Sequence, residues 1–476
     1  MTTETFDAIV IGAGQAGPAI AARCSAEGLK TAVIERHHFG GTCVNVGCTP
    51  TKTLVASARA IRQAQRGAEF GFDVGTLKVD MARVKARKDG LVMQSRQGVE
   101  AWMRGLKNVD VIVGDARFVG PATVEVAGRR LTASRIFLNV GGRSVRPNLP
   151  GIDDVKTLDN VSILELDVVP EHLVIIGGSY IGLEFAQMMR RFGAAVTVVE
   201  RSARLLPRED ADVSDAIREI LEAEGVRFEM GAECLSLAPS TNTSATGGNM
   251  IDVGTACGTG RPTVSGSHVL LAVGRRPNTD GLGLETAGIQ FDTRGYITVD
   301  DQCRTSAEGV WAVGDCNGRG AFTHTAWNDH EVVVANLFDS DNAGQPRRIT
   351  DRIACYGLFI DPALGRIGMT EVEARAEVQI TGRKVLSAKM PMQRVGRARE
   401  AGETQGFMKV LVDADTKMLL GAAILGLNGD EVVHGLLDVM AAKQPYTVIS
   451  RAMHIHPTVS ELVPTLLQQL KPLGSV

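Results

Sequence analysis

The 476-residue chain lacks several features that would place it in a specialised class. Its formal net charge is only −3, so it has no strongly basic character of the kind that nucleic-acid binding requires. No apolar run approaches the roughly 20 residues needed to cross a bilayer. The polar segment Met1–Asp7 leads directly into a strand pattern and does not resemble a secretory signal. We therefore expect a cytoplasmic protein that binds neither nucleic acid nor membrane.

Cysteine is also scarce, with eight residues in the whole chain. A disulfide scaffold is not expected in so long a chain without a secretory signal. Cys43 and Cys48 lie close together in the sequence, and the other six are scattered among apolar neighbours as small buried residues. The pair at 43 and 48 therefore needs its own explanation.

Glycine, by contrast, is abundant: 53 of the 476 residues are glycine, which is well above the usual share of about 7%. This excess predicts several tight turns and loops where the backbone approaches a ligand closely. Hydrophobic residues make up 44% and charged residues 22%, which excludes wholesale disorder. The length predicts about three domains.

A glycine-rich turn lies near the start of the chain. The apolar segment 6–11 predicts a strand, Gly12, Gly14 and Gly17 follow it, and a helical pattern continues to about residue 27. Glu35 ends the next predicted strand, at the distance where an acid accepts hydrogen bonds from a ribose. Backbone N–H groups at such a helix start favour a pyrophosphate. The pattern predicts a dinucleotide-binding unit.

The same pattern returns about 165 residues later as Gly177-Gly178-Ser179-Tyr180-Ile181-Gly182. Ser179 replaces the central glycine with another small residue. Glu200 ends the following strand and favours NAD, whereas Arg201 and Arg204 could receive the 2′-phosphate of NADP. The repeat predicts a second nucleotide-binding domain and leaves NAD against NADP open, with NAD favoured.

The segment Gly40–Lys52 contains the cysteine pair. On an ideal helix the Cα atoms of Cys43 and Cys48 would lie about 8–9 Å apart, beyond the ~7 Å limit for a disulfide. The two can join only if the backbone tightens or kinks, and Gly47 and Pro50 lie where a distortion is easily accommodated. Lys52 follows Cys48 by one helical turn, and its charge would lower a thiol pKa. Two unlinked thiols remain an alternative; a zinc half-site is disfavoured because no second ligand pair is apparent, so we expect no metal site.

Two further regions carry signals. Residues 239–266, rich in Ser, Thr, Gly and Asn, predict an extended surface loop or irregular hairpin with little core to bury. Beyond about residue 348, a hairpin and two helices predict a separate α+β module. Near the end, Thr458 and Glu461 have the spacing of a helix capping box. The alternative is catalytic, with His456 as a general base that Glu461 orients.

Together these segments resemble the class I pyridine nucleotide-disulfide oxidoreductases over nearly the whole chain. The segment Gly40–Lys52 and the segment His456–Glu461 carry the resemblance most specifically. Further matching segments, two of which look like domain crossings and one like a second flavin fingerprint, are 140–143, 272–278 and 313–315. The fold that this implies is α/β, with two Rossmann-like dinucleotide-binding domains, for FAD and NAD(P), and a C-terminal α+β dimerisation domain. The expected boundaries are 1–150 and 279–348 for the FAD-binding parts, 151–278 for NAD(P) and 349–476 for dimerisation.

The resemblance also implies roles for individual residues. Cys48 would be the flavin-facing thiolate and Cys43 the thiol that meets substrate. His456 of the second subunit in a homodimer, with Glu461, would be the acid–base partner of Cys43. Lys52 and Glu184 would form an ion pair beside the flavin, and Tyr180 would gate the nicotinamide pocket. The positions implied for FAD binding are Gly12, Gly14, Gly17, Glu35, Gly41, Thr42, Lys52, Gly142 and Asp315; those for NAD(P)H are Gly177, Ser179, Tyr180, Gly182, Glu200, Arg201 and Gly274.

The implied enzyme passes electrons from NAD(P)H, with NADH favoured, through FAD and the Cys43–Cys48 disulfide to a small-molecule disulfide, quinone or metal ion. The segments 49–52 and 395–398 look closest to mercuric-reductase-like proteins, although the printed C-terminal residues lack the vicinal cysteines of mercuric reductases. Dihydrolipoamide dehydrogenase is the nearest alternative. Two further alternatives are an NAD(P)H oxidase or diaphorase with incidental thiols, and a non-catalytic redox sensor or metal-binding protein.

Overall fold

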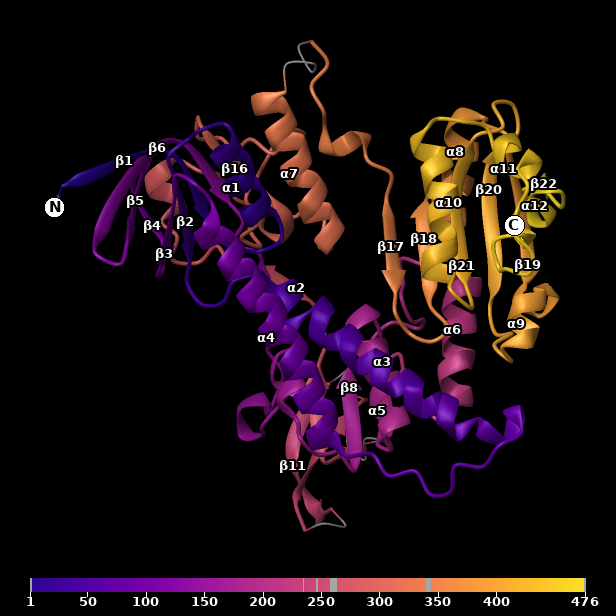
Figure 1. The fold of residues 1–476 in the computed structure, drawn as a ribbon. Helices are drawn as coiled ribbons and strands as arrows, with labels where there is room; N and C mark the ends of the chain where they lie inside the picture. The colour runs from indigo at the N-terminus through magenta and orange to yellow at the C-terminus, as the bar shows by residue number, and fades with distance from the viewer. Residues whose placement is uncertain (1, 234, 245–246, 257–262, 340–343, 475–476) are drawn as a thin grey trace.

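The structure is a computed structural model that describes residues 2–233, 235–244, 247–256, 263–339 and 344–474. Figure 1 shows two α/β regions, one above and one below the central helices, and a third region beside them at the C-terminal end of the chain. The expected α/β class with a C-terminal α+β module is confirmed. No helix among the described residues combines the length and the apolar character that a membrane span needs.

The first sheet contains seven strands, with the apolar β1 (Thr3–Ile11) at its centre. β1 runs parallel to β2 (Thr31–Glu35) on one side and to β6 (Arg129–Leu138) on the other. β3 (Val109–Val113) and β16 (Val310–Ala312) extend the parallel part. β4 (Arg117–Gly120) and β5 (Thr123–Val126) complete an antiparallel meander with β6.

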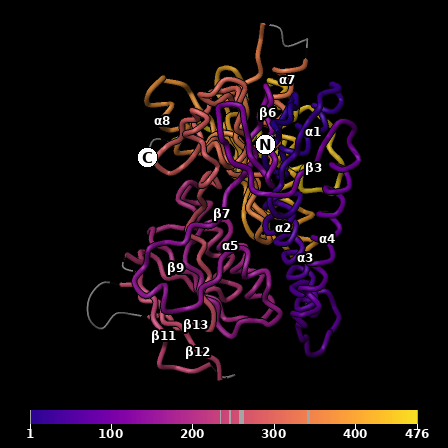
Figure 2. The backbone as a smooth tube through the Cα atoms, turned by 90° about the vertical axis from the view of Figure 1, so that its left-hand side faces the viewer, coloured from indigo at the N-terminus to yellow at the C-terminus, as the bar shows by residue number. Residues whose placement is uncertain are grey.

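Helices cover this sheet and connect it to the rest of the molecule. α1 (Ala16–Ala26) and α7 (Thr323–Phe338) pack against each other, and both contribute to one core with β1. α2 (Gly41–Val46) and α3 (Cys48–Gln65) follow β2, and α4 (Met81–Gly105) returns beside α3. Figure 2 shows α3 and α4 descending side by side along one edge of the molecule.

The second sheet is parallel, in the order β10-β9-β8-β14. Its strands are β8 (His172–Ile176), β9 (Ala195–Glu200), β10 (Arg227–Met230) and β14 (His268–Leu271). α5 (Tyr180–Phe192) follows β8 and packs against α3, and α6 (Ala211–Ala223) follows β9. The predicted repeat of strand, turn, helix and strand is present in both sheets.

The prediction for residues 239–266 is wrong in its estimate of the core. The described residues form a three-stranded antiparallel sheet from β11 (Ser236–Thr243), β12 (Asn249–Gly254) and β13 (Thr263–Gly266). Ile251 and Val253 of β12 are buried and pack in one cluster with β8 and β14. Alternating residues of β12 therefore bury one face of this sheet; Cys234 and Cys257, expected to be buried, lie outside the described residues.

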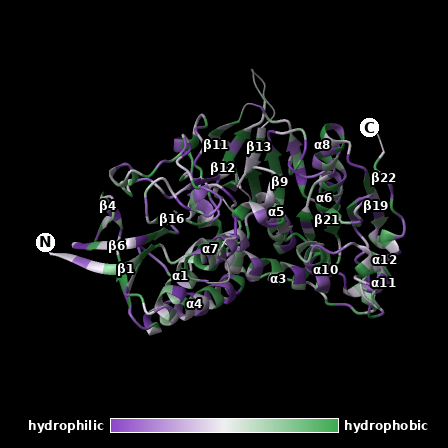
Figure 3. Cartoon of the chain, turned by 90° about the horizontal axis from the view of Figure 1, so that it is seen from above, coloured by the Kyte–Doolittle hydropathy of each residue, from purple (hydrophilic) through white to green (hydrophobic). Residues whose placement is uncertain are grey.

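The C-terminal sheet is antiparallel and has six strands in the order β17-β18-β21-β20-β19-β22. The strands are β17 (Cys355–Leu358), β18 (Leu364–Gly368), β19 (Val385–Pro391), β20 (Phe407–Asp413), β21 (Leu419–Leu425) and β22 (Lys471–Pro472). The predicted hairpin is β20–β21, and both strands are buried along their whole length. Figure 3 shows the resulting band of hydrophobic residues at β21. The accompanying helices are α8 (Glu371–Thr381), α9 (Gly396–Glu400), α10 (Gly429–Ala441), α11 (Thr447–Arg451) and α12 (Leu462–Leu467).

Two features join the regions. β7 (Gly142–Ser144) pairs with β15 (Arg275–Pro277), so the segments 140–143 and 272–278 meet where the chain leaves the first region and returns to it. A buried ion cluster joins the second region to the third. In it, Asp210, just before α6, accepts from Lys409 of β20 at 2.9 Å and lies 3.3 Å from Arg366 of β18. All three side chains are at least 96% buried, which makes this pairing a specific constraint on how the regions meet.

Candidate functional site

The two cysteines lie on either side of a break between helices. Cys43 lies in α2, Cys48 is the first residue of α3, and Gly47 between them has φ −133° and ψ −116°. A side chain at Gly47 would place its Cβ 2.8 Å from the carbonyl oxygen of Thr42. The break brings the side chains of Cys43 and Cys48 close enough for each thiol to shift the pKa of the other. The expected kink is therefore present, and it occurs at Gly47, whereas Pro50 lies inside the first turn of α3.

The environment separates the two thiols electrostatically. The pKa of Cys48 is lowered to about 6, chiefly because the Cys43 thiol donates a hydrogen bond to it. Thr323, whose Oγ1 lies 3.2 Å from the Cys48 sulfur, and the charge of Lys52 lower it further, while burial opposes them. The pKa of Cys43 is raised because it holds the shared hydrogen, and burial adds to this effect. At neutral pH the pair therefore carries one thiolate, on Cys48, and one thiol, on Cys43.

An ion pair lies one helical turn beyond Cys48. Lys52 Nζ lies 2.7 and 3.0 Å from the two carboxylate oxygens of Glu184 in α5, and that side chain is only 6% exposed. Glu184 also accepts the backbone N–H of Phe359 at 3.0 Å, and Lys52 lies 4.4 Å from the centre of the Phe359 ring. Residues far apart in the sequence are thus held together, and the pair predicted from the resemblance is formed.

The two glycine-rich turns are built alike. Glu35 accepts the backbone N–H groups of Ala13 and His37, each at 2.9 Å. About 165 residues later, Glu200 accepts those of Gly178 at 2.6 Å and Ser202 at 2.8 Å. Each acid at the end of its second strand therefore closes the turn that follows the first strand. The sequence repeat is reproduced at the level of individual hydrogen bonds.

The close approaches within these turns explain most of the predicted glycines. A Cβ at Gly12 would lie 2.3 Å from the carbonyl oxygen of Asn139, and one at Gly17 would lie 2.1 Å from that of Gly12. The second turn repeats this geometry, with a Cβ at Gly182 only 2.1 Å from the carbonyl oxygen of Gly177. The third glycine of each turn thus permits close packing of helix on strand. Ser179 precedes the first residue of α5 in extended backbone, and Arg201 is exposed beside Glu200.

The residues around the first turn fit FAD. Gly41 packs against the first turn so closely that a Cβ at Gly41 would lie 2.7 Å from the Cα of Gly14. Backbone N–H groups at a helix start such as that of α1 suit a pyrophosphate. At the end of the first sheet, Asp315 lies beside Gly142, and burial raises the pKa of this carboxyl although Arg275 lies 3.6 Å away.

The same crossing places Gly274, which has φ +126°, where its carbonyl oxygen accepts the N–H of Val145. When bound, FAD supplies the two-electron acceptor between a nicotinamide and the thiols. The described residues do not gather three His, Cys, Asp or Glu side chains that could hold a metal ion.

An aromatic cluster beside the thiols was not found by sequence reasoning, apart from Tyr180. The Tyr180 ring packs edge-on against Phe322 and Tyr356, and the latter two rings are stacked at 5.6 Å. Glu209 accepts from both tyrosine hydroxyls. Burial, followed by the charge of Glu209, raises the pKa of both tyrosines. Thr323 and Tyr180 begin helices, Phe322 directly precedes α7, and Tyr356 lies in β17. The local sequence around Thr323, Phe322 and Tyr356 has no distinguishing pattern.

His456 and Glu461 form a pair away from the thiols. His456 Nδ1 lies 2.8 Å from the Glu461 carboxylate, and the His456 side chain is 81% exposed. Thr458 accepts the backbone N–H of Glu461 at 3.2 Å, but the Glu461 carboxylate binds the imidazole, so the expected capping box is only half formed. Figures 1 and 3 place α12, which follows this pair, at the outer end of the C-terminal region, far from α3. Within one chain the structure therefore does not bring His456 to Cys43.

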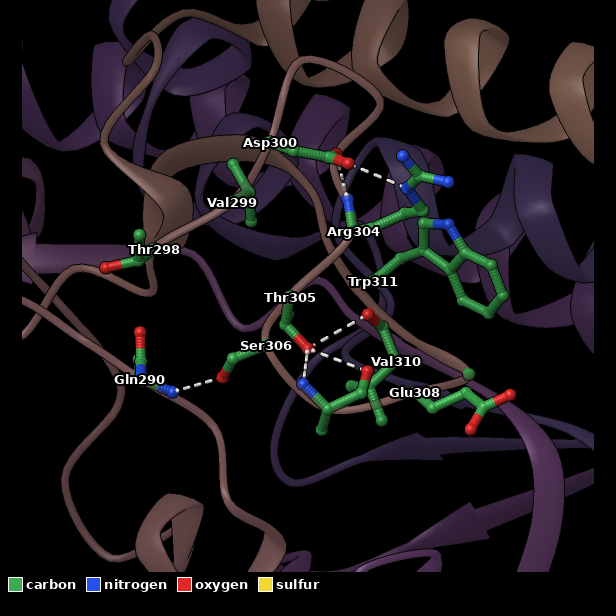
Figure 4. A pocket seen from close by; sticks show the side chains of 12 residues that line it. Gln290, Thr298, Val299, Asp300, Arg304, Thr305, Ser306, Glu308, Val310 and Trp311 are labelled. Carbon is green, nitrogen blue, oxygen red and sulfur yellow. Dashed lines mark hydrogen bonds and ion pairs between the residues drawn. The ribbon is translucent and has the colours of Figure 1, made fainter.

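The remaining cysteines and a surface pocket lie elsewhere. Cys24, Cys303 and Cys316 are buried and Cys355 is half-buried. The pocket in Figure 4 lies on the surface of the first region, where Arg304 pairs with Asp300 at 2.7 Å. Its polar groups largely satisfy one another, and none of its residues was predicted to be functional.

Comparison with known proteins agrees with this geometry. Residues 6–329 match the family model described as pyridine nucleotide-disulphide oxidoreductase, and residues 355–467 match its dimerisation domain. The probable pyridine nucleotide-disulfide oxidoreductase RclA of Escherichia coli is 32% identical, covering 98% of this chain and 99% of that protein. Dihydrolipoyl dehydrogenase of Cupriavidus necator is 34% identical, covering 97% of each chain. Mercuric reductase of Bacillus cereus is 31% identical, covering 90% of this chain and 66% of that protein.

Solved structures give the same result. The HOCl-induced flavoprotein disulfide reductase RclA from Escherichia coli superposes with a TM-score of 0.85 at 33% identity, covering 97% of this chain and 99% of the other. Its Cu(II) complex superposes with a TM-score of 0.86 at 32% identity, covering 98% and 99%. The chain belongs to the pyridine nucleotide-disulphide oxidoreductase family, whose members are FAD-dependent enzymes with NAD(P)H as electron donor, and its dimerisation domain supports a homodimer.

Proposed function

We propose that this protein is a cytoplasmic reductase that carries two electrons from NADH through the Cys43–Cys48 pair to a small-molecule disulfide, quinone or metal ion. The observation that carries the proposal is the asymmetry of the two thiols. Cys48 has a pKa of about 6 and is stabilised as a thiolate by Cys43, Thr323 and Lys52, whereas Cys43 retains its proton. An incidental pair of thiols would need no such arrangement.

The chemistry divides between the two sulfurs. Two electrons and one proton convert the Cys43–Cys48 disulfide to the Cys48 thiolate and the Cys43 thiol. Cys43, once deprotonated, attacks an acceptor disulfide, and Cys48 then displaces the reduced product and restores the disulfide. His456 of the partner subunit, with Glu461 holding its Nδ1, would accept the Cys43 proton and donate it to the leaving thiol. The exposed Nε2 face of His456 in one chain is consistent with this arrangement across a homodimer.

Glu200 supports the choice of NADH. Its carboxylate is fixed at the end of β9 by two backbone N–H groups, where it would accept a ribose hydroxyl and repel a 2′-phosphate. We also propose that residues 1–150 and 279–348 bind FAD and that residues 151–278 bind NAD(P)H. Residues 349–476 would form the dimerisation domain. Asp315 and the glycines of the first turn would hold FAD; Gly177, Ser179, Gly182, Arg201 and Gly274 would line the dinucleotide site.

The acceptor is the least constrained part of the proposal. A Cu(II) complex of a relative supports a metal-ion acceptor in the mercuric-reductase-like manner. The match to dihydrolipoyl dehydrogenase over 97% of each chain favours lipoamide as a second candidate. Both acceptors would be reduced by the same thiol pair.

An anaerobic titration of the FAD-loaded protein with NADH tests the proposal. After two electrons we expect a long-wavelength absorbance from the Cys48 thiolate beside the flavin, and its loss in Cys48→Ser. Cys355→Ser, which changes a half-buried thiol outside the site, is the matched control. Lipoamide, glutathione disulfide, Cu²⁺ and Hg²⁺ are then compared as acceptors. Simple bleaching without the new absorbance, with unchanged NADH oxidation in Cys48→Ser, would replace the proposal with an oxidase or diaphorase.

A further inference from the structure

A buried carboxylate lies between two tyrosines at the edge of the site. Glu209 is 1% exposed, and its Oε1 accepts the hydroxyl of Tyr356 at 2.7 Å and that of Tyr180 at 3.3 Å. Its other oxygen, Oε2, has no hydrogen-bond partner within the part of the chain that the structure describes. The two tyrosines are therefore the side chains that donate to this carboxylate. Neither sequence patterns nor the resemblance assigned a role to Glu209 or Tyr356.

The cluster connects the second glycine-rich turn to the thiol site. Tyr180 is the first residue of α5, immediately after that turn, and Tyr356 lies in β17 of the C-terminal sheet. Phe322, which contacts both tyrosine rings, directly precedes Thr323, the hydrogen-bond partner of Cys48. A displacement of the Tyr180 ring would therefore directly change its contacts with Glu209 and Phe322.

The two hydroxyls are not equivalent. Tyr356 is held in a paired strand and makes the shorter bond, whereas Tyr180 lies at a helix start and makes the longer one. If the Tyr180 ring moves, Tyr356 still pairs with the carboxylate. Without the Tyr356 hydroxyl, the same movement would leave a buried carboxylate with no side-chain donor, which is strongly unfavourable.

We propose that Glu209 and Tyr356 are positioning residues that together form a latch for Tyr180, and that the latch sets how readily the Tyr180 ring moves aside to admit a nicotinamide. The inference rests on the proposed function and on the role that the family resemblance implies for Tyr180, which would gate the nicotinamide pocket. Tyr180 donates to Glu209 in the closed arrangement, and Tyr356 keeps the carboxylate paired in the open one. When the Tyr180 ring moves, the Glu209 carboxylate loses the Tyr180 hydroxyl but keeps that of Tyr356. The latch therefore opposes nicotinamide entry only weakly.

Two variants that each remove one hydroxyl test the latch. Tyr180→Phe removes the bond that holds the ring closed, so the Kd for NAD⁺ and the half-saturating NADH concentration for flavin reduction should fall. Tyr356→Phe leaves Glu209 dependent on Tyr180, so both values should rise by about tenfold, the change produced by 1.4 kcal/mol. ADP-ribose, which lacks the nicotinamide, should bind all variants with an unchanged Kd. Binding is measured by calorimetry on the FAD-loaded protein, with thermal unfolding as a check of folding.

A purely structural cluster would respond differently. In that case both variants would lower the thermal midpoint and shift NAD⁺ binding in the same direction, or leave it unchanged, and the latch would be refuted. Should Tyr356→Phe fail to fold, Glu209→Gln provides the test, because a weaker acceptor should mimic Tyr180→Phe and leave ADP-ribose binding unchanged. Opposite shifts with a flavin that NADH reduces support the latch. Equal shifts with a reducible flavin refute the latch alone, and a wild-type flavin that NADH does not reduce refutes the proposed function as well.

Discussion

The hydrogen bond from Cys43 should determine the pH at which Cys48 becomes a thiolate. It is the largest cause of the lowered Cys48 pKa, ahead of Thr323 and Lys52. A hydrogen bond to a charged group contributes about 1.5–3 kcal/mol, which corresponds to about one to two pKa units. Because a thiol is a weak hydrogen-bond donor, we expect the lower part of this range. Cys43→Ala should therefore raise the Cys48 pKa from about 6 to about 7.

The assay follows the long-wavelength absorbance of the thiolate beside oxidised flavin in single-cysteine variants, as a function of pH. The thiolate forms as pH rises, so its absorbance should increase with pH. A lowered pKa places the midpoint of this increase at a lower pH. Cys43→Ser retains a hydroxyl donor and is the matched control; its midpoint should remain near 6. Equal midpoints for Cys43→Ala and Cys43→Ser would refute this reasoning. The lowered pKa of Cys48 would then be attributed to Thr323 and Lys52.

Three further predictions concern other parts of the site. Glu200→Ser should raise the ratio of kcat/KM for NADPH over NADH about tenfold in steady-state kinetics, because a fixed negative charge no longer opposes the 2′-phosphate. Gly47→Ala should destabilise the protein by about 1–3 kcal/mol in denaturant unfolding, because its Cβ would lie 2.8 Å from the Thr42 carbonyl oxygen, whereas Gly90→Ala, with open space around it, should not. Glu461→Gln should slow acceptor reduction about 10- to 100-fold in stopped-flow experiments without slowing flavin reduction by NADH; equal slowing of both half-reactions would contradict a role confined to proton transfer.

Much of the fold could be predicted because its signals are local. The glycine-rich turns lie between an apolar strand and a helix in both copies, and the acid at 35 or 200 follows at a fixed spacing. The hydrogen bonds of Glu35 and Glu200 show why: each spacing brings the acid back to its own turn. The kink between Cys43 and Cys48 could likewise be predicted from helix geometry, because an unbroken helix keeps these residues too far apart.

Other features could not be predicted because they depend on distant segments. Thr323 approaches Cys48 from α7, 275 residues later, and Glu209 joins Tyr180 of α5 to Tyr356 of β17. The sequence of 239–266 concealed the alternate burial of Ile251 and Val253, since the residues around them are rich in Ser, Thr, Gly and Asn. Local patterns contain no information about such partners, and only the tertiary structure brings them together.

The arrangement of the thiols implies that acceptor choice is made elsewhere in the site. Cys48 owes its low pKa to groups within its own chain, which are Cys43, Thr323 and Lys52. In the proposed mechanism this thiolate only restores the disulfide, whichever acceptor Cys43 has attacked. We propose that the discrimination comes from the residues that would face Cys43 across the homodimer, of which His456 of the partner subunit is the first candidate. Relatives described as dihydrolipoyl dehydrogenase and mercuric reductase can therefore share the family fold and still differ in what they reduce.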